Sequence, residues 1–322
     1  MTGCLRCLRT PVLTGVFVLA AALLLLQGCA TPQVATLDTH WPLGLATRVE
    51  LPDVPFYPQE DFECGPAALA MVAAAAGVAV LPQALVEHVY LPGRKGALQP
   101  EMLAAARRQG LLAYPLRPHL EDLLREVAAG HPVLVFQNLA LSFYPVWHYA
   151  VVIGFDRERN VVLMHSGRSK RLEMSLFTFE RTWARGQHWA MLALAPAQLP
   201  ASAEPAAYGA AVAALERVNP RAAQAAYAAA LQLWPDDRAA LLGAGNTAYA
   251  LGQRHAAITA YRLAVHRRPD FADAWNNLAQ ALLDAGEAGP AGAAIKKAVA
   301  LGGVRLPRYL ELQVKIGGKK RP

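Results

Sequence analysis

The chain has 322 residues and a formal net charge of +7, and 54% of its residues are hydrophobic whereas 17% are charged. This length and composition predict about two globular domains and exclude a disordered or fibrous protein. The basic residues are scattered, with short clusters at Arg107-Arg108, Arg267-Arg268 and Lys319-Lys320-Arg321 and no interleaved aromatic residues. We therefore expect no nucleic-acid partner, because such proteins gather basic charge on one face.

The first thirty residues have the pattern of an export signal. Two arginines precede an apolar run from Val12 to Leu26, which is short for a bilayer span but typical of a signal-peptide core. Leu26-Gln27-Gly28-Cys29 follows at once and resembles the lipobox of bacterial lipoproteins. The resemblance implies cleavage after Gly28, a lipid on Cys29 that anchors the chain to the membrane, and a place in the cell envelope, at the outer membrane facing the periplasm. An uncleaved membrane anchor is the alternative.

Cys64 stands where a proline-rich, extended segment (residues 51–59) meets an apolar helical run. Gly65 and Pro66 suit the first helical turn, and a helix N-terminus favours the thiolate, which is the nucleophilic form of cysteine. Cys64 is also the only cysteine beyond the predicted lipidation site. A solitary thiol in an oxidising compartment is a candidate nucleophile, with a buried structural cysteine as the alternative. Gln59 offers an amide donor of the kind that oxyanion holes use.

Predicted helices precede predicted strands in this half of the chain. Helical spacing of apolar residues predicts helices over residues 64–76, 81–90, 99–109 and 120–129. Short apolar runs predict strands over residues 132–136, 147–156, 161–165 and 188–194. This order predicts an α+β domain. His148 lies at the start of one of the predicted strands, where its imidazole can reach a helix N-terminus as a Cys/His pair requires. The alternative is a histidine with a purely structural role, hydrogen-bonded in the core or on the surface.

Three segments together carry a family resemblance: residues 59–66 with Gln59 and Cys64, residues 130–135, and residues 147–154 with His148. They resemble the bacteriocin-processing, double-glycine type of papain-like cysteine peptidase, over about residues 50–197. The resemblance implies a peptide or protein substrate, Cys64 as nucleophile, His148 as general base and then acid, and Gln59 in the oxyanion hole.

One position departs from that family. Its members usually have an Asp-Pro pair on the strand after the histidine hairpin, where the Asp orients the imidazole, but residues 164–167 here read Met-His-Ser-Gly. His165 or Ser166 is expected to orient His148 instead, and Asp156 is a less well placed carboxylate. Because a neutral group stabilises imidazolium less than a carboxylate does, activity is expected to be lowered or lost. A non-catalytic peptide-binding adaptor and an acyl- or amide-transfer enzyme are the alternatives to a peptidase.

The other histidines of this domain show no metal-ligand spacing. His88, His119, His131 and His188 are not paired with cysteines or carboxylates at such spacing. We therefore predict neither a metal nor a cofactor.

The last third of the chain is alanine-rich and repeats itself every 34 residues. The recurring sets are Tyr227, Tyr261 and Ile295; Ala223, Ala257 and Ala291; Ala230, Ala264 and Ala298; and Pro235 and Pro269. This period resembles tetratricopeptide repeats, which stack helix pairs into a concave surface that binds a protein partner. Generic alanine-rich helices are the alternative.

The sequence thus predicts five segments. They are a lipoprotein signal peptide (1–28), a tether (29–50), a papain-like α+β cysteine peptidase domain (51–197), a linker (198–205) and an all-α tetratricopeptide-repeat domain (206–316).

Overall fold

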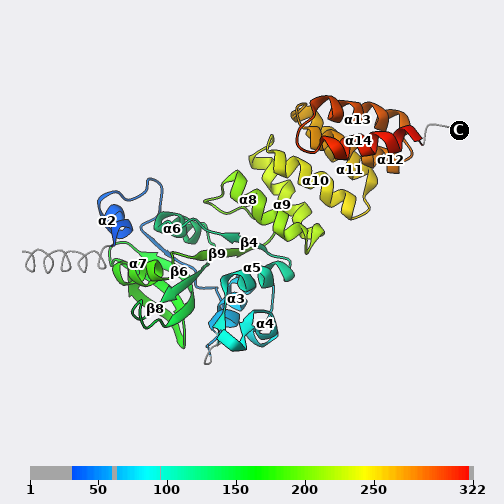
Figure 1. The fold of residues 1–322 in the computed structure, drawn as a ribbon. Helices are drawn as coiled ribbons and strands as arrows, with labels where there is room; N and C mark the ends of the chain where they lie inside the picture. Colours follow the sequence, from blue (N-terminus) through cyan, green and yellow to red (C-terminus); the bar gives the residue numbers. More distant parts are fainter. Residues whose placement is uncertain (1–30, 60–63, 95, 319–322) are drawn as a thin grey trace, which may run out of the picture.

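The computed structural model describes residues 31–59, 64–94 and 96–318, so the predicted signal peptide and Cys29 lie outside the described residues. Within them, a seven-stranded sheet with helices on both faces is followed by a stack of helices (Figure 1). The predicted fold class, an α+β domain followed by an all-α domain, is confirmed. No helix in this part of the chain is both long enough and apolar enough to cross a membrane.

The central sheet has the strand order β4-β9-β5-β6-β7-β8, and β1 pairs with β6 beside this path. Its strands are β1 (Arg48–Glu50), β4 (Leu112–Pro115), β5 (Val133–Asn138), β6 (Trp147–Asp156), β7 (Val161–Ser166), β8 (Ser169–Ser175) and β9 (Ala190–Leu194). A separate small hairpin joins β2 (Tyr90–Leu91) to β3 (Gly96–Ala97). The sequence missed the short strands β1 and β4 and the partly exposed β8 because none of them has a long apolar run.

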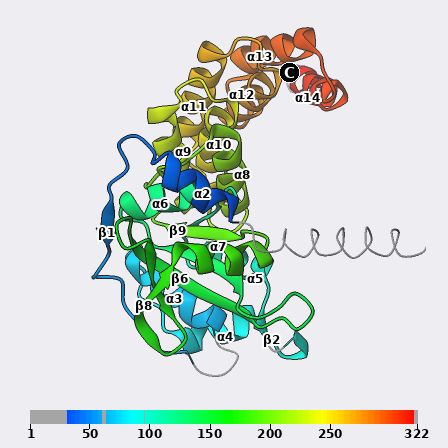
Figure 2. The ribbon, with the colours of Figure 1, turned by 90° about the vertical axis from the view of Figure 1, so that its left-hand side faces the viewer.

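Each face of the sheet has its own core, because neighbouring strand residues point to opposite sides. Val151 lies in the core under α3 to α5, whereas Val152 lies in the core under α2, α6 and α7 (Figures 1 and 2). The helices on the first face are α3 (Cys64–Ala75), α4 (Pro82–Val89) and α5 (Gln99–Arg108); those on the second are α2 (Pro32–Thr39), α6 (Leu120–Ala128) and α7 (Leu176–Arg185). Helix α3 is buried from Gly65 to Ala73, which explains its run of small residues.

The segment predicted as a tether, residues 29–50, packs against the sheet domain in its described part. The backbone N–H groups of Gln33 and Val34, in the first turn of α2, donate to the carboxylate of Glu180 at 3.0 and 2.7 Å. Val34 and Leu37 are buried on one face of this helix, and β1 pairs antiparallel with β6. A short helix with only two buried apolar residues is hard to separate from a proline-containing loop by sequence alone.

Residues 205–318 form three helix pairs, as the 34-residue period predicts, and a single closing helix. They are α8 (Pro205–Glu216) with α9 (Pro220–Leu233), α10 (Arg238–Ala250) with α11 (Arg254–Arg267), α12 (Ala272–Asp284) with α13 (Ala288–Leu301), and α14 (Leu306–Gly318). The equivalent residues Ala223, Ala257 and Ala291 are all fully buried. The stack leads away from the sheet domain (Figures 1 and 2).

The junction between the two domains is ordered, although the sequence predicts a linker over residues 198–205. The buried carboxylate of Glu126 accepts hydrogen bonds from the backbone N–H groups of Ala201 and Ser202, at 3.1 and 2.7 Å, and from the Ser202 hydroxyl. His131 Nδ1 lies 2.8 Å from the same carboxylate. Tyr208 of α8 belongs to the core of the second sheet face. The first repeat is therefore packed onto the sheet domain, whereas α11 to α14 share a separate core.

Candidate functional site

Cys64 is the first residue of α3, and Gly65 next to it lets this end of the helix pack closely against β3. A Cβ on Gly65 would lie 2.7 Å from Cβ of Ala97 in β3, so a larger residue would separate α3 from the small hairpin. Burial raises the pKa of the Cys64 thiol, and backbone N–H groups of Tyr149, Gly65 and Cys64 itself oppose that effect only in part. The helix N-terminus was expected to favour the thiolate, but desolvation is the larger effect here.

His148, in β6, lies between the neighbouring strands at the end of the sheet that meets α3. Its Nε2 lies 2.9 Å from the hydroxyl oxygen of Ser166 in β7. Burial lowers the pKa of His148 to about 4, so the imidazole is neutral at physiological pH. With Nε2 engaged by Ser166, Nδ1 is the nitrogen that remains for proton exchange with another group.

Gln59 is buried and fixed by three hydrogen bonds at the end of the extended segment. Its side-chain Nε2 donates to the carbonyl oxygen of Tyr149 at 3.3 Å, and its Oε1 accepts from the Gly167 N–H at 3.1 Å. Its backbone N–H donates to the Gly167 carbonyl at 3.1 Å. Because an amide nitrogen carries two hydrogens, one N–H of Gln59 remains beside the strand that carries His148.

Of the three candidates for orienting His148, only Ser166 contacts it. The imidazole of His165 points to the other side of β7, where Nε2 lies 3.1 Å from the Val54 carbonyl oxygen and Nδ1 accepts from the Arg171 N–H. Asp156 lies at the opposite end of β6 from His148, next to Arg48 and the Arg159 N–H. The expectations for His165 and Asp156 are therefore not supported by their contacts.

Gln59, Cys64 and His148 line one cavity of about 930 Å³. Aromatic and aliphatic side chains form much of its wall: Ala97, Leu98, Phe136, Pro145, Val146, Trp147 and Tyr149. Arg168 and Arg185 also line it, and none of the described lining residues is acidic. The arrangement brings a thiol, a neutral imidazole and an oriented amide to one partly apolar cavity, which is what nucleophilic attack on a carbonyl carbon needs.

Sequence reasoning missed two parts of this region. Gly167, which holds Gln59 through two hydrogen bonds, follows Ser166 directly and was read only as part of the departure from the family pattern. Part of the apolar side of the cavity comes from Pro145 and Val146, which precede the predicted strand and lie outside the segments that carry the family resemblance. The adjacency of Trp147 to His148 was the one available signal.

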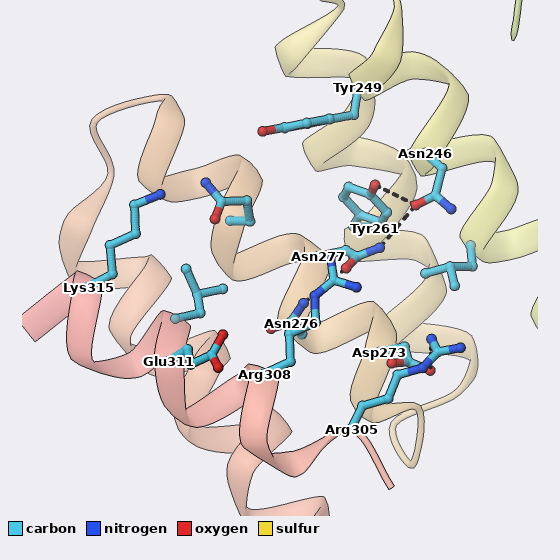
Figure 3. Close-up of a pocket in the computed structure, with 13 residues that line it drawn as sticks. Asn246, Tyr249, Tyr261, Asp273, Asn276, Asn277, Arg305, Arg308, Glu311 and Lys315 are labelled. Atoms are coloured by element: carbon cyan, nitrogen blue, oxygen red, sulfur yellow. Dashed lines mark hydrogen bonds and ion pairs between the residues drawn. The ribbon is translucent and has the colours of Figure 1, made fainter. Parts of the chain in front are cut away.

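A second hollow, which we call the repeat groove, lies among α10, α12 and α14 and has a volume of about 560 Å³. Figure 3 shows Asn246 between the hydroxyl of Tyr261 and the amide of Asn277, which donate to its Oδ1 at 2.9 and 3.0 Å. Asn276 donates in turn to Asn277 at 3.1 Å, and Oδ1 of the buried Asn276 has no protein partner. Charged side chains complete the groove: Arg305, just before α14, and Arg308, Glu311 and Lys315 on α14.

Comparison with known proteins supports the peptidase-like character of the first domain. Residues 51–191 match the family described as the Peptidase_C39 like family. That match covers most of the sheet domain, without α2 and β1, and it does not include the repeats. No curated protein sequence matches the chain.

Three solved structures are similar to parts of the chain. A protein of Bacillus anthracis described as a C39-like peptidase is 20% identical, with a TM-score of 0.40, and the match covers 46% of this chain and 98% of that one. The type III secretion chaperone SycD of Yersinia enterocolitica, solved with a peptide of the translocator YopD, is 22% identical, with a TM-score of 0.33 and coverages of 35% and 92%. The Sgt2 TPR domain of Aspergillus fumigatus is 25% identical, with a TM-score of 0.34 and coverages of 38% and 84%. These scores carry no conclusion about activity.

Proposed function

We propose that the chain is a cysteine peptidase in which Cys64 attacks a peptide carbonyl carbon and His148 moves the proton. The observation that carries this proposal is the convergence of Gln59, Cys64 and His148, from three separate segments, on one cavity. The match of residues 51–191 to a peptidase-like family supports the same reaction class.

In the proposed reaction, Nδ1 of His148 takes the proton from the Cys64 thiol as sulfur attacks the carbonyl carbon. The resulting oxyanion is stabilised by the remaining amide N–H of Gln59 and by the backbone N–H of Cys64. His148 then gives the proton to the leaving amine, and a thioester on Cys64 remains. Water, deprotonated by His148, hydrolyses the thioester and restores the thiol.

The resting pair is proposed to be neutral rather than ionic. Burial raises the pKa of Cys64 and lowers that of His148, and both effects oppose a thiolate–imidazolium pair. Ser166 can either accept from Nε2–H or donate to Nε2, so it fixes the imidazole tautomer less firmly than a carboxylate would. We therefore expect proton transfer to accompany attack, at a rate below that of an enzyme with a carboxylate in this position.

A peptide-library cleavage assay tests this function. Wild type is expected to cleave, whereas Cys64→Ala and His148→Ala are expected to lose cleavage. His88→Ala is the matched control, because His88 lies on α4, outside the cavity lining, and its replacement should leave cleavage unchanged. Cleavage that persists in Cys64→Ala would contradict the proposal.

A non-catalytic peptide-binding adaptor is the second candidate, and one observation favours it. His148 contacts a hydroxyl where the related family has a carboxylate, and its pKa is lowered to about 4. An adaptor would bind the same peptides in wild type and in Cys64→Ala and would cleave them in neither. The cleavage and binding measurements on these two chains therefore separate the candidates.

The repeats are proposed to recruit a protein substrate or partner by holding an extended peptide segment in the repeat groove. Three features support this role: the amides of Asn246 and Asn277, the unpartnered Oδ1 of Asn276, and the charges of Arg308 and Lys315. Amide side chains suit a peptide backbone, which offers donors and acceptors in alternation. Retention of a peptide library on immobilised Cys64→Ala chain should fall when Asn246→Ala and Asn277→Ala are added. Gln224→Ala is the control, because the Gln224 amide lies outside the groove, where it donates to Gln253 at 2.8 Å.

The chain is further proposed to be lipid-anchored through Cys29 in the cell envelope, at the outer membrane facing the periplasm. The Leu-x-Gly-Cys motif after an apolar run supports this location. Helix α2 begins at Pro32, so a lipid on Cys29 would keep the sheet domain close to the membrane surface. Metabolic labelling with a fatty acid should mark the wild type and not Cys29→Ala, and equal labelling would contradict the anchor.

A further inference from the structure

Residues 139–147, which comprise the loop between β5 and β6 and the first residue of β6, expose an unusual number of large apolar side chains; we call this segment the apolar loop. It contains no charged residue. Its exposed large apolar side chains are Leu139, Leu141, Phe143, Tyr144, Val146 and Trp147. Phe143 and Tyr144, near its middle, are 84% and 75% exposed. Contiguous exposed apolar surface of this kind marks an interaction site.

Asn138, a buried residue at the end of β5, holds this loop in one conformation. Its Oδ1 accepts from the N–H groups of Ala140 and Val146 at 3.0 and 2.9 Å, and its side-chain nitrogen donates to the Leu141 carbonyl at 3.4 Å. The guanidinium of Arg185 donates twice to the Asn138 carbonyl, at 3.1 and 3.0 Å. The apolar side chains are therefore presented by a defined loop, so that little loop ordering remains to oppose binding.

The base of the apolar loop is also a wall of the cavity that holds Cys64. Pro145, Val146 and Trp147 line that cavity. The Trp147 ring stacks on Phe136, another lining residue, with ring centroids 5.1 Å apart. One apolar surface therefore continues from the cavity to the exposed side chains of Phe143 and Tyr144.

We propose that the apolar loop binds the substrate on one side of the scissile bond and selects peptides with at least two consecutive large apolar residues there. The cavity wall can take one such residue, and the surface beyond it, at Phe143 and Tyr144, takes the next. This inference rests on the proposed peptidase function, because it treats the cavity as the place where the peptide enters. A peptide is favoured over a lipid surface or a second copy of the chain because only a peptide uses both the cavity wall and the loop.

Binding is measured in the full Cys64→Ala chain, so that cleavage does not interfere. Fluorescence anisotropy compares two labelled peptides of equal length that differ only in a Leu-Phe or a Ser-Ser pair. The Leu-Phe peptide is expected to bind more tightly, and adding Phe143→Ser with Tyr144→Ser should weaken it roughly tenfold or more while leaving the Ser-Ser peptide unchanged. Leu43→Ser is the matched control, because Leu43 is 97% exposed and lies outside the loop; it should have no effect.

Equal binding of the two peptides, or a loop variant that binds like its parent, would overturn the inference. Loop-dependent sedimentation with phosphatidylcholine vesicles, or loop-dependent self-association, would overturn it as well if no peptide preference accompanies it. If wild type cleaves neither peptide while Cys64→Ala keeps the preference, hydrolysis fails and the binding inference stands. If wild type cleaves both peptides equally and binds them equally, hydrolysis stands and the inference fails.

Discussion

The cavity at Cys64 and the repeat groove are two hollows with opposite chemistry in one chain. The cavity has apolar walls, and burial drives both of its titratable partners, Cys64 and His148, toward their neutral forms. The groove has amides and charges, and its Arg305 pairs with Asp273 at 3.0 Å on a surface open to water. Desolvation of the titratable groups therefore dominates in the cavity, whereas the polar groups of the repeat groove stay hydrated.

The difference fits the two roles proposed above, in which the cavity carries out the reaction and the repeat groove binds a protein. A neutral thiol and imidazole beside an apolar wall suit covalent chemistry on a peptide that displaces water. Hydrated amides and cations suit recognition without reaction, because they exchange hydrogen bonds with water for hydrogen bonds with a ligand. Changes in one hollow should therefore leave the function of the other intact.

The largest effect is expected from Cys64→Ser. A hydroxyl is far harder to deprotonate than a thiol, and a neutral imidazole without a carboxylate partner gives it little help, so kcat/KM for peptide cleavage should fall on the order of a thousandfold or more. Peptide retention by the repeat groove should stay the same. A loss of retention in this variant would show that the two hollows are coupled.

A smaller effect is expected from Gly245→Ala, which acts on the groove alone. The added Cβ would lie 2.2 Å from Cε1 of Tyr261, the residue whose hydroxyl holds Asn246. Overpacking of this kind costs about 1–3 kcal/mol, so groove affinity and thermal stability should both fall while peptide cleavage is unchanged. Gly289→Ala in α13 is the control, because nothing lies within 4 Å of its added Cβ. If Gly245→Ala and Gly289→Ala change groove affinity and thermal stability equally, the packing of Tyr261 does not determine the shape of the groove.

The smallest effect concerns stability in acid. The pKa of His148 is lowered from 6.5 to about 4 in the folded chain, so the unfolded chain binds more protons between these values. The free energy of unfolding should therefore fall as the pH drops from 6.5 toward 4. The contribution of His148 to this fall should be roughly 1–2 kcal/mol between pH 6.5 and pH 5. His148→Gln should remove that part of the slope in urea unfolding. Equal slopes for wild type and variant would show that His148 is not buried in its neutral form.

Much of the sheet domain could be predicted because its apolar runs are continuous. Strand β6 was predicted with its observed bounds, Trp147–Asp156. That strand alone also excludes Asp156 as a partner of His148, since a rise of about 3.3 Å per residue places it about 26 Å away. The choice between His165 and Ser166 could not be made from sequence. They face opposite sides of β7, and an irregularity in pairing between Val152 and Gly154 shifts the register that decides which side faces His148.

The repeat groove could not be predicted from the sequence, for a different reason. The 34-residue period predicts the helix pairs through their buried residues, but of the residues that line the groove only Tyr261 belongs to one of the recurring sets. Asn246 and Asn277, which share a hydrogen bond, are not at equivalent repeat positions. The closing helix α14, whose Arg308 and Lys315 line the groove, contributes no residue to the recurring sets.

The central claim is that Cys64 and His148 form a pair that is neutral at rest. The most direct test measures the rate of Cys64 alkylation by iodoacetamide as a function of pH. It compares wild type with His148→Ala and Ser166→Asp. In wild type the rate should rise into the alkaline range without an acid plateau, because burial raises the pKa of Cys64. In Ser166→Asp a carboxylate would replace the hydroxyl 2.9 Å from His148 Nε2, raise the imidazole pKa and shift the rise to lower pH. Three identical profiles, or a plateau below pH 7 in wild type, would contradict the account.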